Sequence, residues 1–297
     1  MKIIIAIKSA TLQLLKSWKG IIIVWFSSLI LVSMIAVPMK GTLNSGLGQS
    51  MITEKLSDGI NIEVFADLGE VMTSLVSFFM SGLFLLILSG FLLNAFLSGG
   101  IFNSLKGESA KFSAGDFFRA SAKNFWSFLV ILLIISIIVL VLALVIVVVP
   151  MSLVGNASVP EEGALLKTLT IVVPLFLLLL TIMLLVADYA RAWQVSKEQN
   201  ACFKALGFGF GQTFKTFFSS YPLMIILLVI QVLYVWFVLN ILTEMKPVTG
   251  FGVFLLFLLS QFLFIIRIML KVWRYGSVTS LMELNSYPSS TPQGGKN

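Results

Sequence analysis

The chain has 297 residues, of which 58% are hydrophobic and only 11% are charged. Soluble domains carry roughly 25% charged residues, so this composition excludes an ordinary soluble globular protein. The chain has no histidine and a single cysteine, which excludes an internal disulfide and removes the commonest metal ligand. We therefore expect no cofactor and no metal site.

Six long apolar runs follow one another along the chain, each near the ~20 residues that an α-helix needs to cross the hydrocarbon core. They cover about residues 21–37, 77–97, 125–149, 167–186, 222–242 and 253–270. The sequence predicts an all-α integral membrane protein with six transmembrane helices in a single domain, residues 1–280. It also predicts an external loop at 38–75 and a disordered C-terminal tail at 286–297.

Lysine and arginine collect at one end of the predicted spans. With six spans both termini share one side of the membrane, and only Lys40, Lys55, Lys167 and Lys246 fall on the other side. Because Lys and Arg near span ends stay in the cytoplasm, both termini are predicted to be cytoplasmic. The net positive charge of the chain then indicates contact with anionic lipids of the inner leaflet. The sequence contains no recognisable nucleic-acid-binding module that would suggest another partner.

Each odd-numbered span begins with a lysine, a small polar residue and an aromatic residue. The predicted interfacial anchors are Lys16, Trp18, Lys123, Trp126, Lys215 and Phe217. A lysine can reach the headgroups while the aromatic ring sits at the interface. An amphipathic stretch precedes each of these ends, as in helices that lie in the membrane plane. We expect a threefold repeat of helical hairpins, each preceded by a cytoplasmic interfacial amphipathic helix.

Two of these amphipathic stretches allow detailed predictions. In the first, one helical face carries Ile3, Ile7, Leu14 and Trp18, and another carries Lys2, Ser9, Gln13 and Lys16. An interfacial helix with such a basic polar face lies in the membrane plane. In the second, Ser113 is placed to cap the N-terminus of a helix, because its hydroxyl can accept a backbone N–H one turn later.

Polar side chains inside apolar spans are costly and usually face protein or water, so they mark candidate functional positions. These positions are Asn94, Asp188, Arg191, Gln231, Tyr234, Gln261 and Arg267. Asp188 and Arg267 would lie near the same leaflet, and we predict that they pair across the bundle. The alternative is that each reaches water or a lipid phosphate separately. Interhelical hydrogen bonding is the simplest role for the amides and Tyr234.

No motif in the sequence carries a recognisable chemistry. The Gly-rich stretch 207–211 lacks the Lys-Ser/Thr pair of a phosphate-binding loop. No Ser/Lys, Ser/His or Asp/Asp arrangement is present for hydrolysis. We assign no catalytic residue, and the sequence leans against an enzyme. A lipid-modifying enzyme would need Asp188, Tyr189, Arg191 and Arg267 to converge on one cleft.

A short stretch carries a family resemblance. Gly99-Gly100-Ile101-Phe102 is followed by Asp116-Phe117-Phe118-Arg119 and Lys123-Asn124-Phe125-Trp126. This stretch resembles uncharacterised bacterial inner-membrane families with six spans, which are loosely similar to the membrane domain of some glycerophosphodiester phosphodiesterases. The resemblance implies a bacterial cytoplasmic (inner) membrane. The chain lacks the soluble phosphodiesterase barrel, so that activity is not implied.

Two functions fit these observations. The first is a non-enzymatic multi-pass membrane protein, a scaffold or accessory subunit that contacts lipid or a partner protein. The partner would bind the external loop 38–75 or the cytoplasmic interfacial helices. The alternative is a transporter or channel with a pathway between the hairpins, which predicts a polar cavity lined by Asn94, Gln231, Tyr234 and Gln261. Burial of each of these four side chains against apolar neighbours would favour the scaffold over the transporter.

Overall fold

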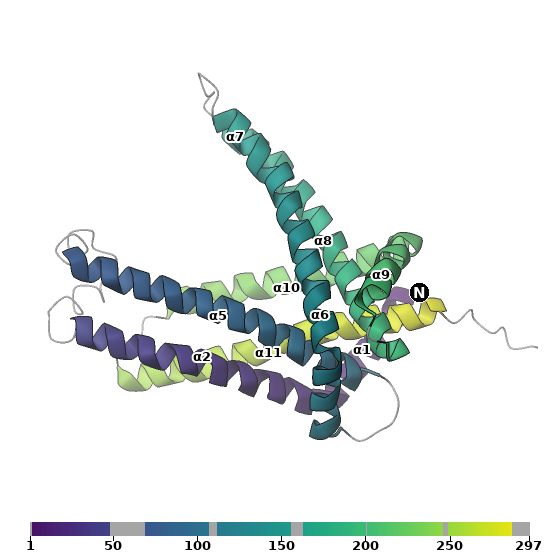
Figure 1. Ribbon diagram of the computed structural model, residues 1–297, viewed down its shortest axis with the longest axis horizontal. Coiled ribbons are helices and arrows are strands. Elements are labelled where there is room, and N and C mark those ends of the chain that lie inside the picture. Colours follow the sequence, from purple (N-terminus) through teal and green to yellow (C-terminus); the bar gives the residue numbers. More distant parts are fainter. Residues whose placement is uncertain are drawn as a thin grey trace, which may run out of the picture. The chain divides into compact units, whose positions relative to one another are not determined.

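The computed structural model describes residues 2–47, 69–106, 112–155, 163–199, 201–245 and 249–286, and this part of the chain is helical without a strand. Its helices, in chain order (Figure 1), are α1 (Lys2–Lys16), α2 (Trp18–Leu47), α5 (Gly69–Ser104), α6 (Ala114–Ala143), η1 (Leu144–Val148), α7 (Val149–Gly155), α8 (Ala164–Lys197), α9 (Cys202–Lys215), α10 (Phe217–Glu244) and α11 (Gly250–Ser286).

Six helical stretches in this part of the chain are long and apolar enough to cross a membrane. They are Trp18–Pro38, Val76–Ser104, Ala114–Val154, Ala164–Lys197, Phe217–Glu244 and Gly250–Asn285. The predicted fold class, all-α with six helices of transmembrane length, is confirmed. The predicted disordered tail lies outside the described residues, except for Ser286, which ends α11.

Two helices continue past the prolines that follow the predicted spans 21–37 and 125–149. The sequence places the start of the external loop at Pro38, but α2 continues to Leu47 and α5 already begins at Gly69. Only the middle of the predicted loop, residues 48–68, lies outside the described residues. The third predicted span ends at residue 149, and the helix continues beyond it through η1 and α7 to Gly155.

The turn before Pro150 shows how the third helix passes a proline. The backbone N–H of Val149 bonds to the carbonyl of Leu144, five residues back, which makes η1 a π-helical turn. Pro150 has no N–H to donate, so a wider turn just before it costs little further hydrogen bonding. At the other end of α6, the predicted cap is confirmed: the Ser113 hydroxyl accepts the N–H of Asp116 at 3.4 Å.

The chain divides into two compact units, Met1–Ile22 with Ala95–Asn297, and Ile23–Asn94. The boundaries fall inside α2 and α5, which run through both units. The smaller unit contains most of α2 and α5. Its large apolar side chains, among them Met34 and Phe84, are exposed, as expected of a surface that faces lipid.

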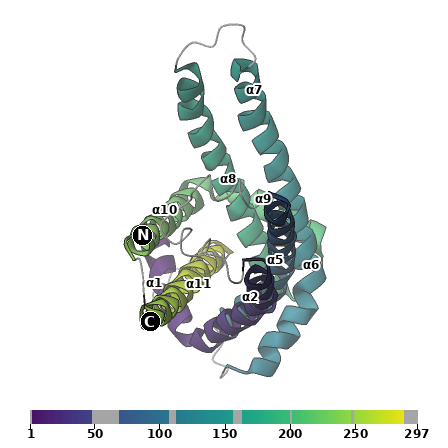
Figure 2. The same ribbon diagram turned by 90° about the vertical axis from the view of Figure 1, so that its left-hand side faces the viewer.

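The core of the larger unit forms around α8, which packs against α6, α9, α10 and α11. Figure 2 shows α8 running beside α6 and α7. Every residue of α8 from Leu185 to Ala192 is buried, and so is every residue of α11 from Arg274 to Met282. Far from this core, the large apolar side chains near the start of α8 and α11 are exposed. The packed core therefore lies at the span ends where Lys and Arg collect, which we call the basic ends.

Three close helix contacts in the larger unit follow one pattern. We call α1, the first turns of α6, and α9 the leading segments, and α5, α8 and α11 the returning helices. A Cβ built on Gly99 of α5 would lie 2.9 Å from a backbone oxygen of α6, and one on Gly209 of α9 would lie 2.5 Å from the Val186 carbonyl of α8. One on Gly276 of α11 would lie 3.3 Å from Ala10 of α1. Each contact brings backbones close because glycine has no side chain.

The two faces predicted for α1 both contact protein in part: Ile3 and Ile7 pack against a buried apolar cluster that includes Leu223 and Leu281, and Ser9 and Gln13 face α11, whereas Lys2 and Lys16 are exposed. The Ser280 hydroxyl of α11 lies 3.2 Å from that of Ser9 and 3.5 Å from Oε1 of Gln13. The opposite side of α1 exposes Ile4 and Leu15, which suits contact with the headgroup region. As predicted, α1 and α9 are separate short helices, whereas the middle leading segment is continuous with α6.

Candidate functional site

Three charged side chains meet between α8 and α11, and we call them the buried ion cluster: Asp188, Arg191 and Arg274. Nε of Arg274 lies 3.0 Å from Oδ2 of Asp188, and Nη1 of Arg191 lies 3.5 Å from Oδ1. Asp188 and Arg191 are one turn apart, so one face of α8 presents both. The exposed fractions of Asp188, Arg191 and Arg274 are 0%, 5% and 9%, so the cluster is almost completely withdrawn from solvent.

The buried ion cluster contains two cations and one anion. Each ion withdrawn from water costs several kcal/mol unless opposite charge and hydrogen bonds compensate for it. The carboxylate of Asp188 therefore has to stabilise two guanidinium groups. Within the described part of the chain, Nε of Arg191, Nε of Arg274 and both carboxylate oxygens of Asp188 are buried and make no hydrogen bond of good geometry. Compensation inside the cluster is thus incomplete.

Aromatic rings border the buried ion cluster. Tyr275 of α11 stacks on Phe102 of α5 with ring centroids 4.6 Å apart, and Phe128 of α6 meets Phe102 edge-on at 6.0 Å. The guanidinium carbon of Arg274 lies 5.2 Å from the Tyr275 ring centroid, and the ammonium of Lys271 lies 5.8 Å from it. These rings join α5, α6 and α11 and keep water away from the charges, which strengthens the electrostatic interactions.

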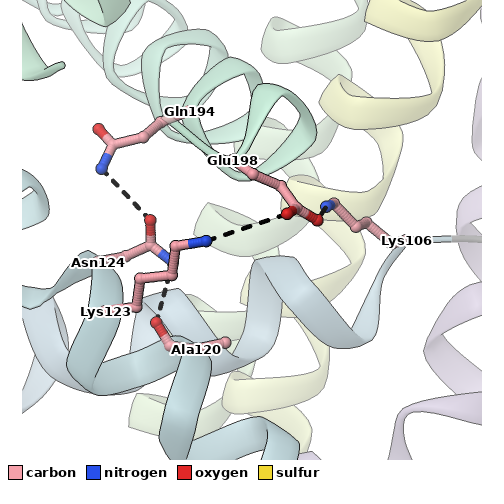
Figure 3. Close-up of polar contacts among 6 residues, drawn as sticks. All are labelled: Lys106, Ala120, Lys123, Asn124, Gln194 and Glu198. Atoms are coloured by element: carbon pink, nitrogen blue, oxygen red, sulfur yellow. Dashed lines mark hydrogen bonds and ion pairs between the residues drawn. The ribbon is translucent and has the colours of Figure 1, made fainter. Parts of the chain in front are cut away.

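Buried amides join α6 to α8 beyond this cluster, as Figure 3 shows. Gln194 donates from Nε2 to Oδ1 of Asn124 at 3.3 Å, and Asn124 donates from Nδ2 to the carbonyl of Ala120 at 2.9 Å. Both amide side chains are buried. Because unpaired amides would be costly here, this contact fixes the rotation of α8 against α6.

At the surface, three charged side chains form the surface ion triad (Figure 3). The ammonium of Lys106 lies 3.1 Å from one carboxylate oxygen of Glu198, and that of Lys123 lies 4.0 Å from the other. The hydrogen bond from Lys106 and the charges of both lysines hold the pKa of Glu198 below its usual value. The triad ties the end of α8 to α6 and to the chain just beyond α5.

A hydroxyl contact joins α8 to α10. The Tyr189 hydroxyl lies 2.6 Å from that of Ser220, which lies 2.7 Å from the hydroxyl of Thr216. Tyr189 and Ser220 are completely buried. Tyr189 is thus used in packing, next to Asp188 in sequence but bonded to a different helix.

The predicted ion pair has the right acid and the wrong base. Asp188 pairs with Arg274 and Arg191, whereas Arg267 is exposed and lies two turns before Arg274 on α11. One signal in the sequence could have identified Arg274. Asp188-Tyr189-Ala190 and Arg274-Tyr275-Gly276 share a charged residue, a tyrosine and a small residue in the same order.

The remaining polar candidates lie in several places. Gln231 donates to the carbonyl of Leu270 at 3.5 Å, and the Tyr234 hydroxyl donates to the carbonyl of Leu263, so both residues join α10 to α11. Gln261 is half-buried on α11. Asn94, also half-buried, belongs to the smaller unit.

Most of the predicted anchors are exposed. Lys16, Lys123 and Lys215 are exposed, and so are Trp18 and Trp126, the latter by 72%. Phe217 is only half-buried and stacks on Tyr221 with centroids 4.8 Å apart. Its neighbour Phe218 is 93% exposed and is the better interfacial residue. A shift of one residue turns a helix by about 100°, so the sequence pattern alone did not separate these two rings.

Six apolar helices, with charge gathered at their basic ends, place the chain in the class of multi-pass membrane proteins. Within the described residues, no group of three His, Cys, Asp or Glu side chains could hold a metal ion. No family model matches the chain, and no curated protein or solved structure matches it either. The resemblance to bacterial inner-membrane families stays a prediction.

Proposed function

We propose that this chain is a non-enzymatic membrane scaffold or accessory subunit whose basic ends lie in the cytoplasmic leaflet and contact anionic lipid. One observation carries the proposal: polar side chains within the spans are used in contacts between helices. Gln231 and Tyr234 bond from α10 to backbone carbonyls of α11. Asn124 and Gln194 join α6 to α8, and Tyr189 joins α8 to α10.

These contacts favour a scaffold over a transporter for a physical reason. A transport pathway needs polar groups that face water and exchange partners as the solute passes. A side chain bonded to a neighbouring helix instead fixes the packing of the two helices. Two of the four residues that a pathway between hairpins would use, Gln231 and Tyr234, are bonded in this way.

The lipid contact is supported by exposed residues at the ends of the leading segments or just after them. Trp18, Trp126 and Phe218 are exposed beside Lys16 or Lys19, Lys123 and Lys215. Aromatic rings favour the interface, and each lysine near an anionic surface adds about 1 kcal/mol of attraction. Three such segments in one protein would hold its basic ends firmly at the headgroups.

Extraction into native nanodiscs, followed by mass spectrometry of everything retained, tests the proposal. We expect a protein partner in fixed stoichiometry and anionic phospholipid enriched over the surrounding membrane. The double variant Lys16→Gln/Lys215→Gln should lower this enrichment. The matched double variant Lys40→Gln/Lys167→Gln should not, because those lysines are predicted to face the other leaflet. Lys123 is left unchanged because it also contacts Glu198.

The transporter alternative has its own readout. The purified protein, reconstituted in a planar bilayer, should carry no ionic current above the lipid background, and proteoliposomes should show no added tracer efflux. A reproducible current or efflux, together with the absence of any stoichiometric partner, would reject the scaffold in favour of a pathway between the helices.

A further inference from the structure

We infer that the buried ion cluster binds a phosphate group, either free phosphate or the phosphate of a membrane phospholipid. The inference does not rest on the scaffold function, because a bound phosphate is compatible with a scaffold or a transporter. It begins from charge: Arg191 and Arg274 share the single carboxylate of Asp188, and all three are at least nine-tenths buried. One positive charge in the cluster is therefore left without a counter-ion.

Hydrogen bonding leads to the same inference. Two guanidinium groups offer roughly ten N–H donors, whereas one carboxylate offers about four acceptor sites. Among the described residues, Nε of Arg191, Nε of Arg274 and both carboxylate oxygens of Asp188 are buried and make no hydrogen bond of good geometry. The three side chains therefore do not satisfy one another, and a group with several acceptor oxygens and at least one negative charge would supply acceptors to the two arginines and the missing negative charge.

The arrangement of bases on α11 gives an approach to the cluster. Arg267, Lys271 and Arg274 follow one another at spacings of four and three residues, so they share one helical face over about 10 Å. Their exposure decreases in that order, from exposed through half-buried to buried. An anion at the helix surface would therefore meet a series of cations that leads to the core.

Two properties favour phosphate among anions. The planar guanidinium group bonds two phosphate oxygens at once, which makes arginine a preferred phosphate ligand. The cluster also lies just beyond the predicted end of the sixth apolar run, at the level where phospholipid headgroups are found. Both sources of phosphate, dissolved in the cytoplasm or carried by lipid, reach this level.

Arg191→Gln is the main test variant. It removes the excess charge and leaves Asp188 paired with Arg274, so the protein should fold. Arg119→Gln is the matched control, since Arg119 is an exposed arginine that also pairs with an acid one turn away, Asp116. Delipidated full-length protein in phosphate-free buffer is titrated with sodium phosphate against sodium chloride of equal ionic strength, and the melting temperature is recorded.

For free phosphate, we expect the melting temperature of the wild type and of Arg119→Gln to rise with phosphate, and the affinity of Arg191→Gln to fall at least tenfold. Asp188→Asn gives a second test that does not require Arg191→Gln to fold. It raises the excess charge, so its stability should be low without phosphate and should recover as phosphate is added.

For a lipid phosphate, the readout is native mass spectrometry of protein taken from nanodiscs that contain phosphatidylglycerol. We expect one phospholipid retained by the wild type and by Arg119→Gln, and lost from Arg191→Gln. Retention of lipid without a response to sodium phosphate identifies the lipid source, and the converse identifies free phosphate. The inference is overturned if neither arm responds, or if the wild type, Arg191→Gln and Arg119→Gln respond equally.

Discussion

Glu198 combines an unfavourable backbone conformation with two ion pairs. It ends α8 with φ of 54°, in the left-handed region that non-glycine residues adopt at a cost of about 1–2 kcal/mol. Glycine is the usual residue at such a helix end. Glutamate at this position brings a carboxylate within reach of Lys106 and Lys123. The ion contacts offset part of the backbone cost and connect three segments of the chain.

The lowered pKa of Glu198 predicts a pH-dependent stability. The folded chain binds a proton there less readily than the unfolded chain, so the triad stabilises the fold above the ordinary pKa of 4.5. That contribution is lost as the pH falls through the lower pKa of the folded state. We expect the wild type to melt above Glu198→Gln near neutral pH and the two to converge below 4.5. Melting curves at low salt measure this difference.

Glu244→Gln serves as the control for this prediction, because Glu244 is an exposed acid at the far end of α10. It should not reproduce the convergence of the melting curves. A difference between the wild type and Glu198→Gln that stayed constant with pH would mean that the lysines do not stabilise the charged carboxylate. High salt should reduce the effect, because the triad is exposed to solvent.

At the scale of helices, the contact between α9 and α8 depends on a single glycine. Gly209 faces the backbone of α8, where an added Cβ would lie 2.5 Å from the Val186 carbonyl and 3.2 Å from Ala190. The glycines on either side of it in sequence order, Gly207 and Gly211, would place a Cβ in open space. Of the three glycines in this stretch of α9, Gly209 is therefore the one that the packing on α8 requires.

Alanine substitutions in α9 should separate these roles. Gly209→Ala should cost about 1–3 kcal/mol, because the helices have to move apart to admit the methyl group. Gly207→Ala and Gly211→Ala should be neutral or stabilise by up to about 1 kcal/mol, since alanine favours a helix over glycine. Thermal unfolding of the three variants in one detergent measures the order. Equal effects at all three positions would show that helix propensity, and not packing on α8, governs this segment.

For the chain as a whole, the threefold repeat stays a prediction, but the helix contacts indicate which residues of the three predicted repeats are equivalent. In each leading segment, the residue six positions before the final lysine packs on a returning helix. Ala10, before Lys16, contacts Gly276; Phe117, before Lys123, contacts Gly100; and Gly209, before Lys215, contacts Ala190. In this register Ser98, Asp188 and Arg274 are equivalent, and the two charged members form the ion pair. The first turns of α6 then pack on α5, and α9 packs on α8, which in each case is the returning helix of the preceding repeat. The first leading segment, α1, packs on α11, the returning helix of the last repeat.

This register predicts that the chain tolerates circular permutation between repeats. The ammonium of Lys2 bonds to Oδ1 of Asn285 at 2.9 Å, so the start of α1 lies beside the end of α11. A variant that joins the two termini through a flexible linker and begins at Ala201, between α8 and α9, should fold and melt within a few degrees of the wild type. Size-exclusion chromatography and thermal unfolding test this expectation.

The control permutant begins at Phe210, inside α9, and should fail because it divides the segment that packs on α8. Both permutants keep their ends on the basic side, so a difference between them does not arise from membrane topology. Failure of the first permutant as well would mean that the contact of α1 with α11 does not substitute for a continuous connection between repeats.

Features that depend on local composition could be predicted from the sequence. Six apolar runs, the cap at Ser113 and the exposed lysines each follow from a few neighbouring residues, and the structure bears out the runs and the cap. The helix ends near Pro38 and Pro150 do not follow from a few neighbouring residues, since a proline removes one hydrogen bond and a long apolar helix can continue beyond it.

Which side chains meet depends on how the helices pack, and local sequence does not predict it. Asp188 pairs with Arg274 and not with Arg267, and Ser9 and Gln13 of α1 face α11, because the helices have particular rotations about their axes. Spans that are apolar all round carry no periodic signal for that rotation. Close contacts such as that of Gly209 with Val186 set it instead, and these join residues from separate helices whose approach local sequence does not encode.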